Sequence, residues 1–447
     1  MMEVRKRTGI SLQLSNLRPK LLRTPPELPT TRGGAMSTEI RSVDSDDNPK
    51  EHVSLPGHLR TIAEFLVVGI CTVVFVVSAI GDGTRLLTGS NAASRDFITY
   101  WASARQLIHH SNPYDAHDIL QLEHSAGFPP GVSVMVMRNP PFTLPLALPL
   151  GFFNEKIAAG LWSLLLLGSL IASVRIVWIM HNRPDNYLHY LGYTFAAALS
   201  CLASGQISLF VLLGLVLFLR FNRTSPLIAG ASLWFCALKP HLFLPFGAVL
   251  LAWIITSNRY RIAVGAVGAF LVSLTIAYAL DPSAWLHYRE MMSHAGIEKQ
   301  PIPCVSIVLR QIIRPESAWL QYLPAFLGCV WALFYFYKHR NGWDWMEHGS
   351  LLMLVSVAVA PYAWFMDQVV LIPALLHALY QTRSRLAVAV LASISAIIEI
   401  ANFRGVPLVS VPLYVWTAPA WLLWYLWASR PITPLHDHDR LVISASL

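Results

Sequence analysis

Asp96 is the first residue whose type and position suggest chemistry. It stands near the start of a predicted helix and shares one face with Tyr100 and Ser103, because spacings of four and three residues follow the helical period. The helix dipole favours an ionised carboxylate at this position, where it could accept a proton or bind a sugar hydroxyl. The alternative is that Asp96 only caps its helix, for which Ser94 is the other candidate.

Further polar residues occur as short groups at the ends of apolar runs. These groups are Arg138–Asn139, Gly205–Gln206, Lys239–Pro240–His241 and Asp367–Gln368. Each allows a purely structural explanation: a bond to a carbonyl for Gln206, snorkelling for Lys239 and helix capping for Asp367. Lys239 is the hardest to explain in this way, because a cation within an apolar stretch is costly unless it is paired or functional.

Cations close to a carboxylate suit transfer of a group from a phosphate. Arg138, Lys239 and His241 could neutralise the leaving phosphate while Asp96 deprotonates an incoming hydroxyl. A phosphate leaves without a general acid, so one base and a cationic clamp suffice, whereas glycoside hydrolases use two carboxylates. Asp96 and Asp367 could hold a metal ion only if folding brings them together. We expect them to hold hydroxyls, and we predict no metal and no cofactor.

The elements that must position these residues are membrane helices. Apolar residues make up 55% of the chain and charged residues 13%, with a mean hydropathy of +0.50, which is far from the composition of a soluble domain. We predict an all-α polytopic membrane protein with about twelve transmembrane helices, since a helix of roughly 20 residues crosses the bilayer. The expected spans are 61–81, 157–180, 187–203, 206–221, 226–240, 241–257, 262–280, 319–337, 348–364, 368–380, 386–402 and 409–428.

The basic residues of short loops predict the orientation of these spans. With a cytoplasmic amino terminus, most of them fall on the cytoplasmic side. They are Arg183, Arg220, Arg223, Arg259, Arg261, Lys338, Arg340, Arg383, Arg385 and Arg430. Two long loops, 82–156 and 281–318, and all the polar groups then face outward. Residues 1–60 and 429–447 are expected to be cytoplasmic tails, the first of them disordered.

Two loop segments carry more specific predictions. The apolar segment 132–153 is expected to be re-entrant or to lie on the surface, because Pro140 and Pro141 interrupt it. In the second loop, Val305, Val308 and Ile312 have helical spacing. Together with Ile307 they predict an interfacial helix that packs this apolar face on the membrane surface and whose Arg310 or Arg314 contacts lipid head groups.

The sequence indicates neither a nucleic acid partner nor a cysteine framework. The 33 Lys and Arg residues, against 25 Asp and Glu, form no basic stripe with interleaved aromatic residues, so no nucleic acid partner is expected. The five cysteines have neither disulfide nor metal spacing.

The motifs also resemble those of a known family. "RDFITYWASARQLIHHSNPYDAHD", "RNPPFTLPLALPL", "SGQISLFVLLGL", "ALKPHLFLP" and "MDQVVLIPAL" follow one another between residues 60 and 380. This series resembles the family 87 glycosyltransferases of the GT-C architecture. The resemblance implies transfer of a sugar, typically mannose, from a polyprenyl-phosphate donor to a lipid or glycan acceptor, with inversion. It also implies a bacterial plasma membrane with the active site on its outer face.

The resemblance carries specific residue assignments. It implies that Asp96 is the base and that Asn112, Pro113 and Tyr114 form the family's Asn-Pro-Tyr turn. The chain departs from the family at Arg138–Pro141, where relatives often have an aromatic residue before the prolines. The expected substrate-binding residues are Tyr100, Asn112, Tyr114, Arg138, Asn139, Gln206, Lys239, His241, Asp367 and Gln368.

A transporter or flippase for a lipid-linked sugar is the alternative. Transporters place polar groups near the bilayer midplane, often in repeated halves. The sequence has no internal repeat, and Glu399, a carboxylate within a span, lies near the predicted outer end. A scaffold protein would have no use for polar residues gathered on one side. A glycosyltransferase in contact with membrane lipids is therefore the prediction.

Overall fold

The computed structural model describes residues 96–127, 131, 133–294, 302–404, 406 and 410–430, and the isolated positions 69, 73 and 77. The chain divides into two units, Met1–Ser54 and Leu55–Leu447, and every described residue belongs to the second. The expected tail over 1–60, most of the expected span over 61–81 and nearly all of the carboxyl-terminal tail lie outside the described residues. Those described form helices and no strand.

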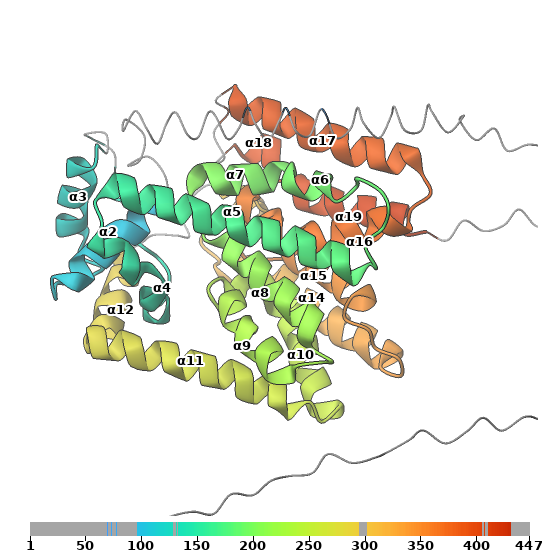
Figure 1. The fold of residues 1–447 in the computed structure, drawn as a ribbon, viewed down its shortest axis with the longest axis horizontal. Coiled ribbons are helices and arrows are strands. Elements are labelled where there is room, and N and C mark those ends of the chain that lie inside the picture. Colours follow the sequence, from blue (N-terminus) through green and yellow to red (C-terminus); the bar gives the residue numbers. More distant parts are fainter. Residues whose placement is uncertain are drawn as a thin grey trace, which may run out of the picture. The chain divides into compact units, whose positions relative to one another are not determined.

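The helices follow one another with short connections (Figure 1). Before the first long helix lie α2 (Phe97–Ile108), α3 (Ala116–Ser125), η1 (Pro141–Thr143), α4 (Leu144–Ala147) and η2 (Leu148–Phe152). The middle of the chain forms α5 (Glu155–Met180), α6 (Tyr190–Tyr193), α7 (Ala196–Ser204), α8 (Ser208–Phe221), α9 (Pro226–Ala237), η3 (Pro240–Phe243), α10 (Leu244–Thr256) and α11 (Tyr260–Leu280). The remainder forms α12 (Ala284–His294), α13 (Val305–Ile313), α14 (Trp319–His339), α15 (Glu347–Ala358), η5 (Phe365–Leu371), α16 (Ile372–Gln381), α17 (Arg385–Phe403), α18 (Val411–Tyr414) and α19 (Thr417–Ala428).

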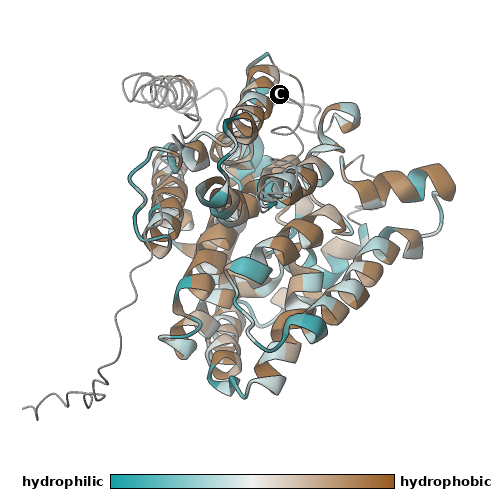
Figure 2. Ribbon diagram, turned by 90° about the vertical axis from the view of Figure 1, so that its right-hand side faces the viewer, coloured by the Kyte–Doolittle hydropathy of each residue, from teal (hydrophilic) through white to brown (hydrophobic). Residues whose placement is uncertain are grey.

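Four of these helices, α5, α11, α14 and α17, are long and apolar enough to cross a membrane. Their outer faces carry large apolar side chains that are more than half exposed, such as Val264 on α11 and Phe334 on α14. Figure 2 shows hydrophobic ribbon along many of the helices. Apolar faces of this extent are typical of helices that contact lipid. Each expected run from residue 157 onward coincides with a helix or with two consecutive helices, and the crossing of the shorter ones stays a prediction.

Helices α8, α9 and α11 pack closely through glycines. A Cβ atom at Gly230 would lie 2.0 Å from the carbonyl oxygen of Ile262, and one at Gly214 would lie 2.6 Å from that of Ser232. Only a residue without a side chain allows two backbones to approach so closely, and membrane helices commonly associate in this way. This packing fixes α8, which follows the Gly205–Gln206 turn, and α9, which precedes the turn that carries Lys239.

The segment around Pro140 and Pro141 forms short turns and no single long helix, which confirms the predicted interruption. Residues 133–138 have no regular structure, and η1, α4 and η2 follow. These turns pack on α2: Trp101 Nε1 donates to Phe153 O at 3.0 Å and Arg105 Nη1 donates to Gly151 O at 2.9 Å. Helix α2 is buried from Phe97 to Ala104, so it lies inside the protein.

Helix α13 forms in the second long loop, but the predicted lipid contact of Arg310 is wrong. The Arg310 side chain is buried and donates from Nη1 to Gln321 Oε1 at 2.7 Å. This contact directs the guanidinium to α14, and Ile307, which was also expected to pack on the membrane surface, is buried within the protein. The exposed apolar residues of α13 are Ile312 and Ile313, and Arg314 is exposed beside them.

Contacts between loops agree with the predicted grouping of basic loops on one side. Arg223, after α8, pairs with Asp344, before α15, at 2.9 Å. His181, after α5, is hydrogen-bonded to His377 of α16, with 3.0 Å between Nε2 and Nδ1. These two contacts bring together the carboxyl-terminal ends of α5, α8 and α16 and the start of α15. The candidate site lies at other helix ends.

Candidate active site

Asp96 occupies the N-cap position of α2 but makes no side-chain capping bond. Its Oδ2 atom accepts a hydrogen bond from Nε2 of Gln206 at 2.6 Å. The capping explanation of this residue is therefore wrong, and so is a carbonyl partner for the Gln206 amide nitrogen. Asp96 is partly exposed, and its Oδ1 atom has no hydrogen-bond partner among the described residues. Ser94, the other expected cap, lies outside the described residues.

The turn between α7 and α8 places Gln206 beside Asp96. Gly205 has a φ of +72°, a left-handed conformation that favours glycine. A Cβ atom at Gly205 would lie 2.7 Å from Cβ of Phe97, so the missing side chain also lets this turn press against the start of α2. Trp162 Nε1 donates to Gly205 O at 2.7 Å and anchors the turn to α5.

Lys239 and Asp367 form a buried ion pair. Lys239 Nζ lies 2.5 Å from Asp367 Oδ1, which also accepts from Ser208 Oγ at 2.7 Å. Asp367 Oδ2 accepts from the backbone N–H of Trp364 at 2.9 Å, so one oxygen caps η5 while the other holds the cation. Lys239 is 7% exposed and does not snorkel.

Electrostatics places this ion pair and Asp96 in one cluster. Burial raises the pKa of Asp96 to about 6, with Lys239 acting in the opposite direction and the charge of Asp367 adding to the rise. Burial is the largest effect on Asp367 and acts to raise its pKa, but the attraction of Lys239 and His241 and the hydrogen bonds from Lys239 and Ser208 together leave that pKa below its usual value. Asp367 therefore stays ionised against Lys239, and Asp96 is the carboxylate that can exchange a proton near neutral pH.

Arg138 and Asn139 join the outer loops to the cluster. Asn139 Nδ2 donates to Leu238 O at 3.1 Å, and Tyr114 Oη donates to Asn139 O at 3.1 Å. Burial lowers the pKa of Arg138, while the charge of Asp96 acts to raise it, so the guanidinium lies within electrostatic range of that carboxylate. Asn112 shapes the turn before α3, because its Oδ1 accepts from the N–H of Tyr114 at 2.9 Å.

His241 lies beside the ion pair, whereas Gln368 points elsewhere. The His241 ring stacks on Tyr362 with 3.8 Å between centroids, and its Nδ1 atom is buried with no partner in the described chain. Gln368 donates from Nε2 to Thr417 Oγ1 at 2.6 Å, and its Oε1 accepts from Trp421 Nε1 at 2.9 Å. Both ends of the Gln368 amide thus hold α19 to η5.

Three residues of the cluster were not predicted from the sequence. Ser208 contacts Asp367, Tyr362 stacks on His241, and Tyr288 of α12 donates to Arg138 O at 3.4 Å. Ser208 stands two residues after Gln206, which was the one available signal. The two tyrosines have none, because they approach from distant elements.

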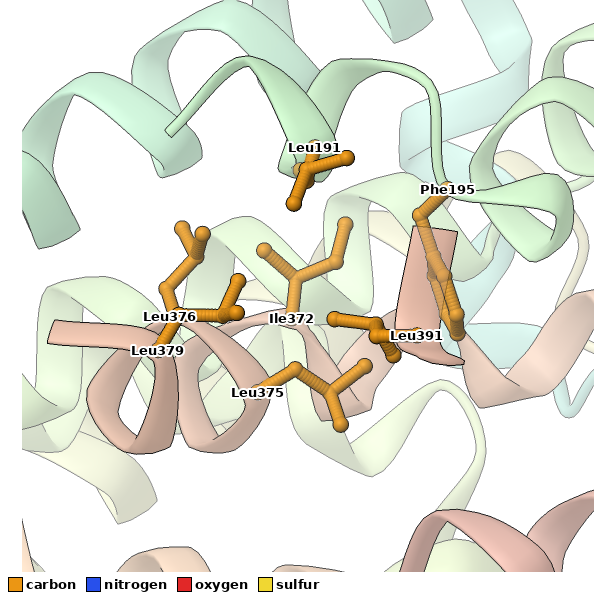
Figure 3. Close-up of a pocket in the computed structure, with 8 residues that line it drawn as sticks. Leu191, Phe195, Ile372, Leu375, Leu376, Leu379 and Leu391 are labelled. Atoms are coloured by element: carbon orange, nitrogen blue, oxygen red, sulfur yellow. The ribbon is translucent and has the colours of Figure 1, made fainter. Parts of the chain in front are cut away.

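Neither a metal site nor an apolar pocket coincides with the polar cluster among the described residues. No group of three or more His, Cys, Asp or Glu side chains is arranged to hold a metal ion there. Figure 3 shows an apolar pocket between α6, α16 and α17. Its lining residues are Leu191, Gly192, Phe195, Ile372, Leu375, Leu376, Leu379 and Leu391, none of which belongs to the polar cluster.

The chain matches a known protein family. The model of glycosyltransferase family 87 matches residues 138–399, more than half of the chain. This range contains Arg138, Gln206, Lys239 and Asp367 and begins after Asp96. No curated protein and no solved structure matches.

Proposed function

This chain belongs to glycosyltransferase family 87, which makes it a glycosyltransferase, and we propose the substrates and the base of its reaction. The proposed donor is a polyprenyl-phosphate-linked hexose, namely mannose. The proposed acceptor is a hydroxyl group of a lipid or glycan at the outer face of the membrane. Transfer proceeds with inversion, because a single displacement moves the sugar directly from phosphate to acceptor.

Asp96 is the base in this proposal, and its environment is the observation that carries it. The residue is partly exposed, burial raises the pKa of its carboxyl group to about 6, and its Oδ1 atom has no hydrogen-bond partner in the described chain. Oδ1 takes the proton of the acceptor hydroxyl while that oxygen attacks the anomeric carbon. The bond from this carbon to the phosphate oxygen breaks, and polyprenyl phosphate leaves with the electron pair.

Arg138 supplies the positive charge for the leaving phosphate. Lys239 is neutralised by Asp367, so this pair adds little net charge, although the ammonium group has further N–H donors. His241 offers its buried Nδ1 as a hydrogen-bonding group. Cations and donors placed where charge develops are commonly the largest contribution to such a reaction.

The test is transfer by the purified protein from radiolabelled polyprenyl-phosphate-mannose to acceptors in a membrane lipid extract. Asp96→Asn should fold, bind the donor and lose about 10² to 10⁴ in single-turnover rate. Asp118→Asn, on α3, is the matched control and should transfer normally. A nearly normal Asp96→Asn enzyme would contradict the proposed base. Asp82 follows the first expected span, in an Asp-Gly pair typical of a turn, and lies outside the described residues. An inactive Asp82→Asn variant together with an active Asp96→Asn variant would move the base to Asp82.

The same preparation distinguishes a glycosyltransferase from a transporter of the lipid-linked sugar. In liposomes, a flippase would move the labelled donor across the bilayer without forming a new glycoside. Such an outcome would contradict the proposed reaction.

A further inference from the structure

We infer that Gln206 is a positioning residue for the catalytic base, and that Tyr100 fixes the orientation of Gln206. This inference rests on the proposed role of Asp96. It replaces direct substrate contact, the role expected for Gln206 and Tyr100 from the sequence, with contact to the base itself.

The orientation of the Gln206 amide follows from its neighbours. Its Oε1 atom lies 3.0 Å from the backbone N–H of Ile207 and 3.1 Å from Tyr100 Oη. A backbone N–H can only donate, so the amide oxygen must face it. The Nε2 group then faces Asp96 Oδ2 at 2.6 Å. If the amide were reversed, its NH₂ group would face the N–H donor of Ile207, and its oxygen would face the carboxylate of Asp96.

This arrangement gives the two oxygens of Asp96 different tasks. Oδ2 accepts the hydrogen bond of Gln206, which leaves Oδ1 to receive the proton. A hydrogen bond to the charged form favours that form, and Gln206 thereby opposes the effect of burial on this carboxylate. The amide therefore does two things for the base: it fixes the rotation of the carboxylate and keeps it ionised closer to neutral pH.

The surroundings of Gln206 suit a rigid support. Gln206 is 9% exposed and Tyr100 is 3% exposed, so substrate has little access to either. The ring of Tyr100 packs on Trp162, with 5.1 Å between centroids, and Trp162 also holds the carbonyl of Gly205. Hydrogen bonds thus link Tyr100, Gln206 and Asp96 in a short chain, and Trp162 supports that chain by packing on Tyr100 and bonding to Gly205.

The pH dependence of kcat/KM tests this role, because a merely structural residue would lower the rate without moving the acidic limb. Gln206→Met removes the N–H donor, and the limb should move to higher pH by about one to two units. Tyr100→Phe keeps the Ile207 N–H contact and should give a smaller shift in the same direction. Gln381→Leu is the matched control. This change removes an amide that is hydrogen-bonded to the imidazole of His377, at helix ends that do not carry the site. It should leave the acidic limb of the pH profile in place.

An infrared titration of the carboxyl group gives a second readout. The band that disappears in Asp96→Asn belongs to Asp96, and its midpoint should rise in Gln206→Met and in Tyr100→Phe. This measurement needs no substrate and stays informative if a variant turns over slowly. If Gln206→Met does not fold, Tyr100→Phe decides the question by the same two measurements.

The outcomes separate this inference from the proposed function. An active Asp96→Asn enzyme would contradict the proposed base. An inactive Asp96→Asn enzyme, combined with Gln206→Met and Tyr100→Phe enzymes whose limb and carboxyl midpoint are unchanged, would overturn only the role of Gln206. A shift of both midpoints in Gln206→Met, absent from Gln381→Leu, would establish it.

Discussion

Lys239 Nζ lies 2.5 Å from Asp367 Oδ1, and both side chains are buried, although 128 residues separate them in the chain. The cation comes from the turn after α9 and the carboxylate from η5, so the pair ties together two elements that contribute to the site. A buried pair of this kind is costly to break from one side, because the remaining charge has no compensation.

Removing Lys239 should therefore destabilise the protein as well as affect catalysis. We expect Lys239→Met to lower the free energy of unfolding by about 3–5 kcal/mol, visible as a lower Tm in detergent. The double variant Lys239→Met with Asp367→Asn should recover much of that loss, since no charge is left unpaired. A Lys239→Met protein as stable as the wild type would show that the pair does not form. Donor binding by the stable double variant then reports what Lys239 contributes to the phosphate.

The rate of transfer should depend on pH through Asp96. Burial places its pKa at about 6, so the carboxylate is protonated and inactive as a base below that pH. We expect kcat/KM to be level above this value and to fall about tenfold for each pH unit below it. If kcat/KM did not change between about pH 5 and about pH 8, the assignment of the base would be contradicted, because a carboxyl group with a pKa of about 6 titrates within that range.

Gly205→Ala should disturb both the fold and the base. The residue has a φ of +72°, where a side chain costs roughly 1–2 kcal/mol, and the new methyl group would meet Phe97 Cβ at 2.7 Å. We expect a lower Tm and a slower reaction, because Gln206 moves with the turn. Gly168→Ala is the control. It lies within α5 with no heavy atom within 4 Å of the added group, and it should be neutral or slightly stabilising.

Glu123 should make stability depend on pH. Burial raises its pKa from 4.5 to about 7, against the N–H of Met135, which bonds to both carboxylate oxygens and lowers it. The folded protein therefore holds this proton more tightly than the unfolded chain, and the corresponding stability is present below the unfolded pKa and lost as pH rises through about 7. We expect the Tm advantage of Glu123→Gln over the wild type to grow from about pH 5 to about pH 8. An advantage that is equal at both pH values would contradict this.

The helices were predictable from the sequence, whereas the contacts between them were not. Apolar runs located the helices from residue 157 onward except α12 and α13, which lie in the second long loop, and Pro140 and Pro141 correctly marked an interruption. Sidedness also gathered Asp96, Lys239 and Asp367 into one region. It could not reveal that Lys239 already has a carboxylate partner, because partners so distant in sequence are decided by helix packing.

The same limit explains two further differences. Arg310 has the spacing of a residue that faces lipid, but Gln321 on the neighbouring α14 offers it a buried acceptor. Gln368 looks like a partner of Asp367 in the sequence, yet the helical rotation between adjacent residues directs it to Thr417 and Trp421. Periodicity identifies a face of a helix, and the neighbour of that face depends on the whole fold.

Helix α2, buried from Phe97 to Ala104, has a consequence for the entropy of the reaction. A base on a mobile loop must be ordered again in every catalytic cycle, and that ordering adds to each barrier. The backbone that carries Asp96 has lost its freedom already during folding, when the side chains around it packed. The ordering that remains for each turnover falls on the two substrates.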